Sequence, residues 1–282
     1  MRSFSLIPPH PMLLRFIVVL LIMVAALPLA RSAPSCSAES GTVRVPLLEL
    51  YTSEGCDSCP PADRWVSSLR QRGYAPDRAL VLAWHVDYWD RLGWPDPYAQ
   101  ARFSARQRDA NHRNGARFVY TPQLLLEGAD YRRGAFRDDL GDRVAALAQQ
   151  KPGAHLRLTL TPAADDAHLR ADITVPEPAS RNSAAAYIVL YENTLSTQVK
   201  AGENRGKELL HDFVVRESWG PFASGTADRS SITQRIVLRP GWKAANLHVA
   251  AYVQDPATGR TLQTLSLPYC PGGVPGTGKT RP

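Results

Sequence analysis

The chain has 282 residues, of which 44% are hydrophobic and 21% charged, and its formal net charge at pH 7 is +7. This composition is enough to build a globular core, and the length allows one large domain or two of ordinary size. Basic residues are densest in 102–117, at the mixed spacing of a solvated helix face and without a nucleic-acid-binding module. The sequence therefore argues against nucleic acid as a partner.

The first 33 residues have the pattern of a signal peptide. Arg2 and Arg15 flank a polar stretch, the run 16–27 is almost wholly apolar, and small residues follow. Because that run is shorter than the roughly 20 residues of a membrane span, we expect cleavage, no stable membrane insertion afterwards, and a secreted or periplasmic protein. An uncleaved anchor and a lipid on Cys36 are the alternatives. Export implies an oxidising compartment, where disulfides persist.

Residues 43–150 alternate between strand and helix patterns, which is typical of an α/β layer fold. The predicted elements are strand 43–51, helix 61–72, strand 79–86, helix 98–114, hairpin strands 123–126 and 130–133, and helix 136–150.

After residue 151 the pattern changes to short alternating or apolar runs with turn residues between them. These runs are 155–160, 169–175, 186–191, 232–238, 247–253 and 262–267. They predict a second domain, antiparallel and β-sandwich-like, over 151–267. The tail 271–282 is rich in glycine and proline, and we expect it to be disordered.

The motif Cys56-Asp57-Ser58-Cys59-Pro60 stands between the first predicted strand and the first predicted helix. Backbone N–H groups at a helix start have no intrahelical partner, and their positive potential favours a thiolate. We therefore interpret the cysteines as a redox pair, in which Cys56, the more exposed, is the nucleophile and Cys59 resolves the mixed disulfide.

Residues around the pair modify this prediction. A residue before proline is pushed out of the α region, so we expect Cys59 not to be helical and the helix to start at Pro60 or Pro61. Nearby negative charge on Asp57 and Glu54 opposes a thiolate. We therefore expect a reducing pair.

Thr121 and Pro122 open the predicted strand 123–126. Only about 5–6% of X–Pro bonds in folded proteins are cis, but the order strand, Cys-x-x-Cys, helix, strand, helix, Thr-Pro, hairpin, helix is that of the thioredoxin fold. We predict a cis bond here, with Pro122 in van der Waals contact with the cysteine pair. The backbone of Thr121 would then dock the substrate as an added strand.

A second candidate group ends the strand 79–86. His85 and Asp87 share a face of that strand by the period of two, and Trp89 follows them. Three interpretations stay open: a proton shuttle for the cysteines, a metal site formed together with them, or a structural anchor of the loop.

Three separated motifs carry a resemblance to a known family: Glu-Leu-Tyr-Thr-Ser-Glu-Gly-Cys-Asp-Ser-Cys-Pro-Pro-Ala-Asp at 49–63, His-Val-Asp-Tyr-Trp-Asp at 85–90, and Tyr-Thr-Pro-Gln at 120–123. In these the chain resembles the bacterial secreted family known as domain of unknown function 1223. The resemblance implies a thioredoxin-like fold with an additional C-terminal β region and a location outside the cytoplasm. It implies no particular substrate.

Thioredoxins also bury an acidic residue on the first strand, which assists proton transfer. Here Leu50 occupies the aligned position and Glu49 is one residue away. A shift of one residue places a side chain on the opposite face of a sheet, so the sequence does not assign this role to Glu49.

Other uses of the cysteines remain open. A zinc half-site has the right spacing, but no second Cys-x-x-Cys or His-x-x-x-His accompanies it. A purely structural disulfide between Cys56 and Cys59 is a further alternative. Cys36 and Cys270 have no other thiol near them in the sequence, and pairing with each other is the natural use of an even count.

The preferred interpretation is an extracytoplasmic thiol–disulfide oxidoreductase that needs no cofactor and no metal. Its partners would be thiol or disulfide proteins and an unidentified electron partner. The alternatives are a copper-binding metallochaperone-like protein, since soft thiolates select Cu(I), and a non-enzymatic binding protein with a structural disulfide.

Overall fold

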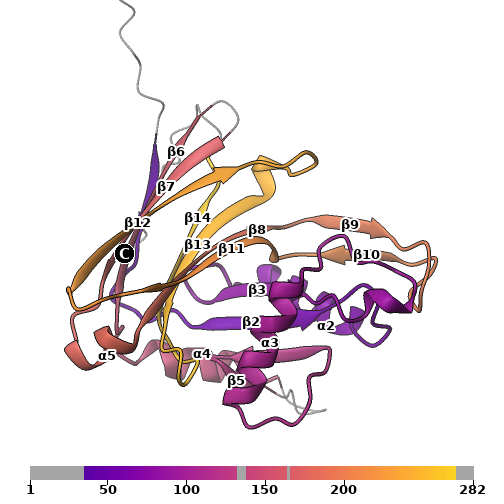
Figure 1. Ribbon diagram of the computed structural model, residues 1–282, viewed down its shortest axis with the longest axis horizontal. Coiled ribbons are helices and arrows are strands. Elements are labelled where there is room, and N and C mark those ends of the chain that lie inside the picture. Colours follow the sequence, from indigo (N-terminus) through magenta and orange to yellow (C-terminus); the bar gives the residue numbers. More distant parts are fainter. Residues whose placement is uncertain (1–34, 132–137, 164–165, 271–282) are drawn as a thin grey trace, which may run out of the picture. The chain divides into compact units, whose positions relative to one another are not determined.

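The computed structural model describes residues 35–131, 138–163 and 166–270 (Figure 1). The predicted signal peptide, 1–33, and the predicted tail, 271–282, lie outside the described residues. Among the helices that are described, none is long and apolar enough to cross a membrane.

Within the described residues, the first part of the chain contains every element predicted for it, with ends that differ by a few residues. Residues 132–133 of the predicted second hairpin strand and residues 136–137 of the predicted last helix lie outside the described residues. The elements are β1 (Cys36–Glu39), β2 (Leu47–Thr52), α2 (Pro60–Gln71), β3 (Leu80–His85), the 3-10 turn η2 (Asp90–Leu92), α3 (Ala101–Arg113), β4 (Gln123–Leu126), β5 (Ala129–Asp130) and α4 (Leu140–Ala148).

The start of α2 differs from the prediction in one respect. The helix begins at Pro60, as expected, but Cys59 has φ −76° and ψ −37°, which lie in the α region. Steric crowding by the following proline is outweighed here because the Cys59 carbonyl already accepts N–H bonds from Ala62 and Asp63, at 2.9 and 3.2 Å. Cys59 is thus the N-cap, with the backbone conformation of the helix.

The second part is rich in strands and contains three that the sequence did not predict, β9, β10 and β11. Its elements are β6 (His155–Pro162), β7 (Asp166–Thr174), α5 (Pro178–Ser183), β8 (Ala185–Glu192), β9 (Leu195–Gln198), β10 (Glu208–His211), β11 (Val214–Ala223), β12 (Arg229–Val237), η3 (Ala244–Asn246), β13 (Leu247–Gln254) and β14 (Thr261–Pro268).

One large sheet runs through both parts of the chain. Its strand order is β14-β13-β8-β11-β3-β2-β4-β5, with β2 and β3 parallel and β4 antiparallel to β2. The junction is the parallel pair of β11 with β3, where Val214 lies opposite Ala83. The boundary expected at residue 151 therefore does not separate two sheets, because strands from both sides of it share this one.

A second sheet, β1-β6-β7-β12, is antiparallel throughout. Its apolar side chains pack against those of β8 and β13 in one core, with Leu158 and Leu169 on one side and Leu190 and Val249 on the other. The Cys36–Cys270 disulfide joins β1 to the second residue after β14, at a Cα separation of 6.5 Å. This pairing was expected.

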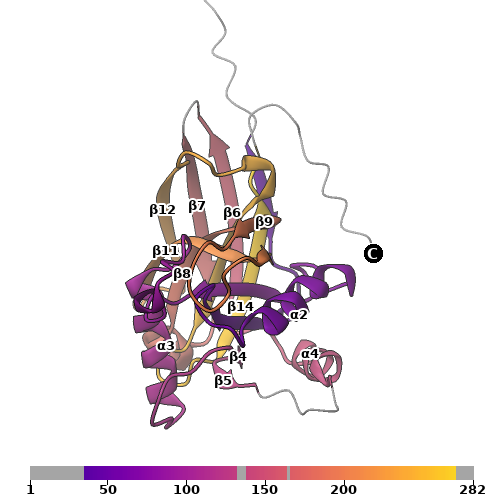
Figure 2. The ribbon, with the colours of Figure 1, turned by 90° about the vertical axis from the view of Figure 1, so that its right-hand side faces the viewer.

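Helices cover both faces of the large sheet around β2 and β3. Figure 2 shows α2 and α4 on one side of these strands and α3 on the other. The alternation along β2 fits this arrangement: Thr52 bonds to Asp63 of α2, whereas Glu49 pairs with Arg106 of α3. The end of β2 and the start of α2 together position the cysteine motif.

Candidate functional site

Cys56 and Cys59 form a disulfide in the turn between β2 and α2, with their Cα atoms 5.4 Å apart. Backbone bonds from Cys56 N to Ser53 O and from Cys59 N to Cys56 O shape the turn. The two cysteines are 1% and 0% exposed. Both cysteines are thus buried in this oxidised state, because the turn folds both sulfurs inward, and the greater exposure of Cys56 stays a prediction.

Ser58 links the buried pair to the surface. Its side chain is exposed, and its hydroxyl oxygen lies 3.4 Å from the sulfur of Cys56, within hydrogen-bond distance. A hydroxyl in this position can donate to a thiolate when the disulfide is reduced.

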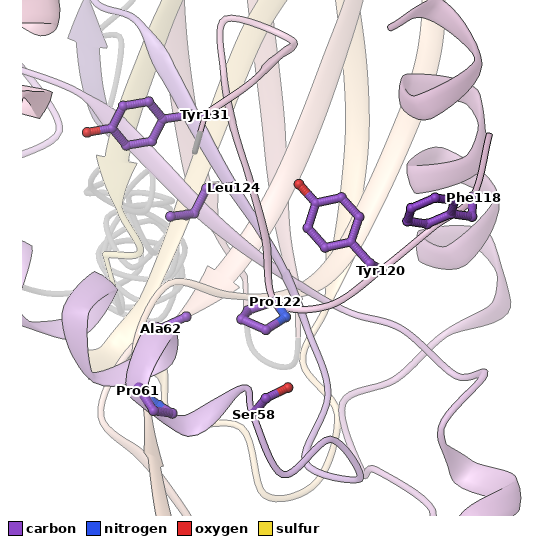
Figure 3. Close-up of a pocket in the computed structure, with 8 residues that line it drawn as sticks. All are labelled: Ser58, Pro61, Ala62, Phe118, Tyr120, Pro122, Leu124 and Tyr131. Atoms are coloured by element: carbon purple, nitrogen blue, oxygen red, sulfur yellow. The ribbon is translucent and has the colours of Figure 1, made fainter. Parts of the chain in front are cut away.

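An open, mostly apolar groove of about 680 Å³ lies beside the pair (Figure 3). One side is formed by Ser58 and the first turn of α2, and the other by the segment that leads into β4 and by the residue that follows β5. The lining residues are Ser58, Pro61, Ala62, Phe118, Tyr120, Pro122, Leu124 and Tyr131.

The Thr121-Pro122 peptide bond is cis, which confirms that prediction. Pro122 lines the same groove as Ser58, and Figure 3 shows the proline ring between Tyr120 and Ser58. Direct contact between Pro122 and the sulfurs stays a prediction. Phe118, at the rim, is 72% exposed.

Trp89 connects the cysteine turn to the proline segment. Its indole Nε1 donates to the hydroxyl of Thr121 at 2.8 Å. The Cβ of Trp89 packs closely against Gly55. A Cβ placed on Gly55 would lie only 3.0 Å from it, so a larger residue at position 55 would displace Trp89. The sequence predicted Trp89 near the site but not this contact.

His85 is fully buried and pairs with Asp96 rather than with Asp87. Its Nδ1 lies 2.7 Å from Oδ2 of Asp96. Burial lowers the pKa of His85, but the Asp96 carboxylate, with Asp63 and Glu54 beyond it, outweighs this and holds the pKa above the usual 6.5. Burial raises the pKa of Asp96, and His85 and backbone N–H donors bring it below 3.8. The pair is thus an ion pair over an interval of moderate pH.

Asp87 serves a different purpose. Its backbone N–H donates to the hydroxyl of Ser104, and that hydroxyl in turn donates to the Asp87 carboxylate at 2.5 Å. These bonds fix the loop after β3 to α3, as the anchoring interpretation expects.

A second buried pair, Glu54 and His211, lies beside the first. The Glu54 carboxylate lies 3.1 Å from Nε2 of His211 and accepts a bond of 2.8 Å from the indole of Trp94. The rings of His85 and His211 meet edge to face with centroids 5.0 Å apart. The negative charge of Glu54 is thus directed at a histidine and not at solvent.

Asn204 fixes the cysteine turn from the opposite side. Its side-chain amide donates to the carbonyls of Glu54 and Cys56, at 2.8 and 2.9 Å, and the residue is fully buried. Asp57 is exposed, and its N–H reaches a carboxylate oxygen of Glu203 at 3.4 Å. The loop between β9 and β10 therefore holds the backbone on both sides of Cys56.

Asp63 is a buried acid on the first turns of α2, close to the pair in sequence. It follows Cys59 by one helical turn and accepts a bond from the Thr52 hydroxyl at 3.1 Å. Burial raises its pKa above 3.8, although His211 and His85 oppose this. A small cavity of about 100 Å³ is lined by both Asp63 and His211.

Glu49, by contrast, does not lie beneath the cysteines. It forms a buried ion pair with Arg106, at 2.7 Å, on the face of the sheet that α3 covers. This agrees with the one-residue shift that placed it on the opposite face.

Sequence reasoning missed Asp63, Asn204 and His211 as site residues. Asp63 carries a local signal, since it is an acid one turn into the helix on its buried face. Asn204 and His211 carry none, because they follow the motif by about 150 residues. Across the described ranges, no group of three or more His, Cys, Asp or Glu side chains is arranged to hold a metal ion.

Two solved structures resemble the chain. Protein AGR_C_4864 from Agrobacterium tumefaciens has a TM-score of 0.57 and 25% identity, over 83% of this chain and 99% of that one. HBP35 of Porphyromonas gingivalis has a TM-score of 0.60 and 12% identity, over 81% of this chain and 76% of that one, which is a likeness of fold alone. A comparison with curated proteins found no match.

One family profile, described as protein of unknown function (DUF1223), matches residues 47–254. This range extends from the start of β2 to the end of β13, so it includes the cysteine motif, both histidine pairs and Asn204. The chain belongs to the DUF1223 family.

Proposed function

We propose that this chain is a thiol–disulfide oxidoreductase whose segment from β2 to α4 is a thioredoxin-like unit. Support comes from the strand order β3-β2-β4-β5, in which β2 and β3 are parallel. Along the chain, α2 connects β2 to β3 and α3 connects β3 to β4. Two neighbouring parallel strands need a crossover connection, which here is α2. The strands β11, β8, β13 and β14 extend this unit beyond β3.

In the proposed reaction, the reduced pair attacks a disulfide of a substrate protein. The thiolate of Cys56 forms a bond to one substrate sulfur, and the other substrate sulfur leaves as a thiolate that takes up a proton. Cys59, after losing its proton, attacks Cys56 and releases the second substrate thiol. The substrate has gained two electrons, and the chain holds the Cys56–Cys59 disulfide; the reverse sequence oxidises a dithiol substrate.

The groove beside the pair is the proposed substrate site. Its apolar lining, in which Phe118 is exposed and Tyr120 and Pro122 are half-buried, fits an extended polypeptide that presents a cysteine next to apolar side chains. Ser58, which lines the groove and touches Cys56, marks where the substrate sulfur would approach.

The buried acids and histidines are the proposed proton-transfer groups. Asp63 is one turn from Cys59, and its raised pKa suits an acceptor for the proton that Cys59 must lose. The small cavity that Asp63 shares with His211 offers a route for that proton to solvent. A location outside the cytoplasm is part of this proposal, supported by two disulfides and the N-terminal sequence pattern.

The proposal depends above all on one observation: the Cys56–Cys59 disulfide lies in the turn between β2 and α2, beside an open groove. Trapping in cells that export the protein tests it. Cys59→Ser should accumulate mixed disulfides through Cys56, because the resolving thiol is gone, and Cys56→Ser should not.

The matched control is the Cys36→Ser/Cys270→Ser double variant, which lacks the other disulfide and retains the pair. It should reduce and reoxidise as the wild type does, with a potential nearer about −270 mV than about −120 mV. Equal trapping by both single variants, or by neither, would support a structural disulfide. Stoichiometric Cu(I) on the reduced pair without trapping would support a metallochaperone.

A further inference from the structure

A second cavity, of about 350 Å³, lies on the face of the large sheet that α3 covers, away from α2 and the cysteine groove. The groove and this cavity share no lining residue. Its lining consists of Trp84, Arg102, Phe103, Ala105, Arg106, Asp109, Arg113, Tyr187, Ser218, Trp219, Gly220, Pro221, Tyr252, Gln254 and Pro256. Strands β3, β8, β11 and β13 thus meet α3 around it.

Three polar groups of this lining have no hydrogen-bond partner among the described residues: Nε1 of Trp84, the hydroxyl of Tyr252 and Nε of Arg113. Trp84 and Tyr252 are 1% and 0% exposed. The two nitrogens can only donate, and the hydroxyl can donate as well. Each buried donor without an acceptor costs about 1–3 kcal/mol, so three in one cavity indicate that an acceptor group belongs there.

The charges of the lining favour an anion. Arg106 pairs with Glu49, at 2.7 Å, and Arg102 pairs with Glu217, at 2.5 Å, a carboxylate that it shares with Arg239. Arg113 forms no ion pair within the described part of the chain, and its buried Nε is unpartnered. The carboxylate of the lining, Asp109, belongs to an exposed residue. The unpaired charge beside the buried donors is therefore positive.

The apolar part of the lining indicates that the anion is organic. The rings of Tyr187 and Tyr252 stack at 4.9 Å with an interplanar angle of 12°, and Phe103 meets Trp84 edge to face at 5.0 Å. The volume falls in the range of about 300–1,000 Å³ that is usual for small-molecule sites.

We propose that this cavity binds a small organic anion. Its oxyanion group accepts hydrogen bonds from Trp84, Tyr252 and Arg113, and its apolar part lies against Phe103 and Tyr187. The proposal is independent of thiol–disulfide exchange, since it involves no cysteine and the opposite face of the sheet.

Calorimetric titration of the mature chain with phenylacetate and phenyl phosphate tests the proposal, with benzyl alcohol as the uncharged probe. Both anions should bind with saturation, and the tighter one identifies carboxylate or phosphate as the preferred group. Arg113→Gln should weaken binding about tenfold, which corresponds to about 1.4 kcal/mol. Tyr252→Phe keeps the ring and removes only the hydroxyl, and Trp84→Phe keeps one aromatic ring and removes the indole N–H; each should weaken binding about threefold to tenfold.

Arg108→Gln is the matched control, because Arg108 is an exposed arginine of α3 outside the cavity; binding should be unchanged. Tyr252→Phe should melt no lower than the wild type, since the hydroxyl it loses has no protein partner. Trp84→Phe also removes packed volume from the core and should melt lower. The proposal is overturned if neither anion saturates the protein below about 10 mM, if benzyl alcohol binds as tightly, or if Arg108→Gln weakens binding as much as Arg113→Gln.

Discussion

The indole of Trp89 donates a 2.8 Å hydrogen bond to the hydroxyl of Thr121, while the base of the same side chain lies against Gly55. One residue of the loop after β3 thus touches the turn that carries the cysteines and the segment that precedes Pro122. The two sides of the proposed substrate site are fixed relative to each other through this side chain.

Trp89→Phe should therefore slow exchange without unfolding the protein. Phenylalanine keeps a ring against Gly55 but cannot donate to Thr121, and a lost neutral hydrogen bond is worth about 0.5–1.5 kcal/mol, or up to about tenfold in rate. The measurement is the rate at which the reduced protein reduces a disulfide-containing peptide. Trp242→Phe, whose indole ring stacks with Arg216 and Arg239, is the control and should match the wild type. A normal rate for Trp89→Phe would limit this bond to a structural role.

Replacement of Asn204 should destabilise the oxidised protein. Asn204→Ala leaves the carbonyls of Glu54 and Cys56 buried without their donor, and each such loss costs about 1–3 kcal/mol. Asn204→Asp, of the same shape but without the amide donor, should be at least as harmful. Urea unfolding measures both, with Lys207→Ala as the control, because the Lys207 ammonium bonds to the side-chain oxygen of Asn204 and not to the carbonyls of Glu54 and Cys56. If the wild type and all three variants were equally stable, the cysteine turn would not depend on Asn204 for its stability.

Patterns within short stretches of sequence predicted the helices and strands whose formation depends on neighbouring residues. The apolar run before Cys56, the two prolines after Cys59 and the periodic helices gave β2, α2, α3 and α4 nearly as observed. Strand pairing is set by contacts distant in sequence, and nothing in β11 indicates that it pairs with β3. For this reason the sequence predicted a domain boundary where one sheet continues.

The candidate site divides in the same way. Cys56, Cys59, Pro122 and Trp89 could be predicted because their positions in the order of elements bring them to one edge of the sheet. The partners of Glu54 could not, since His211 reaches it only through the hairpin of β9 and β10. That hairpin was missed because its strands have four residues each, and the sequences Leu-Ser-Thr-Gln and Glu-Leu-Leu-His do not alternate between apolar and polar residues, although their burial does.

The His85–Asp96 pair should make stability depend on pH. The raised pKa of His85 gives stabilisation that is complete below 6.5 and is lost as pH rises through the folded-state value. The lowered pKa of Asp96 gives stabilisation that is complete above 3.8 and is lost as pH falls through its folded-state value. The stabilising interval of the pair is therefore about pH 3.8 to 6.5.

The measurement is the free energy of unfolding of the wild type minus that of Asp96→Asn, taken across pH. The difference should be largest inside this interval and smaller at both ends. Asp87→Asn is the control, because Asp87 bonds to Ser104 and not to His85; its difference from the wild type should not follow this profile. A pH-independent difference for Asp96→Asn would mean that His85 stays neutral in the folded protein.

Asp63→Asn should separate stability from activity. Because burial raises the pKa of Asp63, folding favours its neutral form. Below pH 3.8 Asp63 is protonated in both the folded and the unfolded protein, so its ionisation costs no stability. Above the pKa of the folded state this loss of stability is complete. Asparagine is neutral at every pH and can still accept the bond from Thr52. The variant should therefore be more stable than the wild type at pH 7, and this gain should disappear as pH falls toward 3.8.

Activity should change in the opposite direction, because an amide cannot take the proton that Cys59 must lose before it attacks the mixed disulfide. Stopped-flow measurement of the second step, the release of substrate from Cys56, should show slowing of about 10²-fold or more, the usual contribution of a general base. Arg64→Gln is the control: Arg64 is exposed and lines the same small cavity, so neither stability nor rate should change. If Asp63→Asn is stabilised yet resolves at the wild-type rate, Asp63 is a buried structural acid, and the proton of Cys59 leaves by another path.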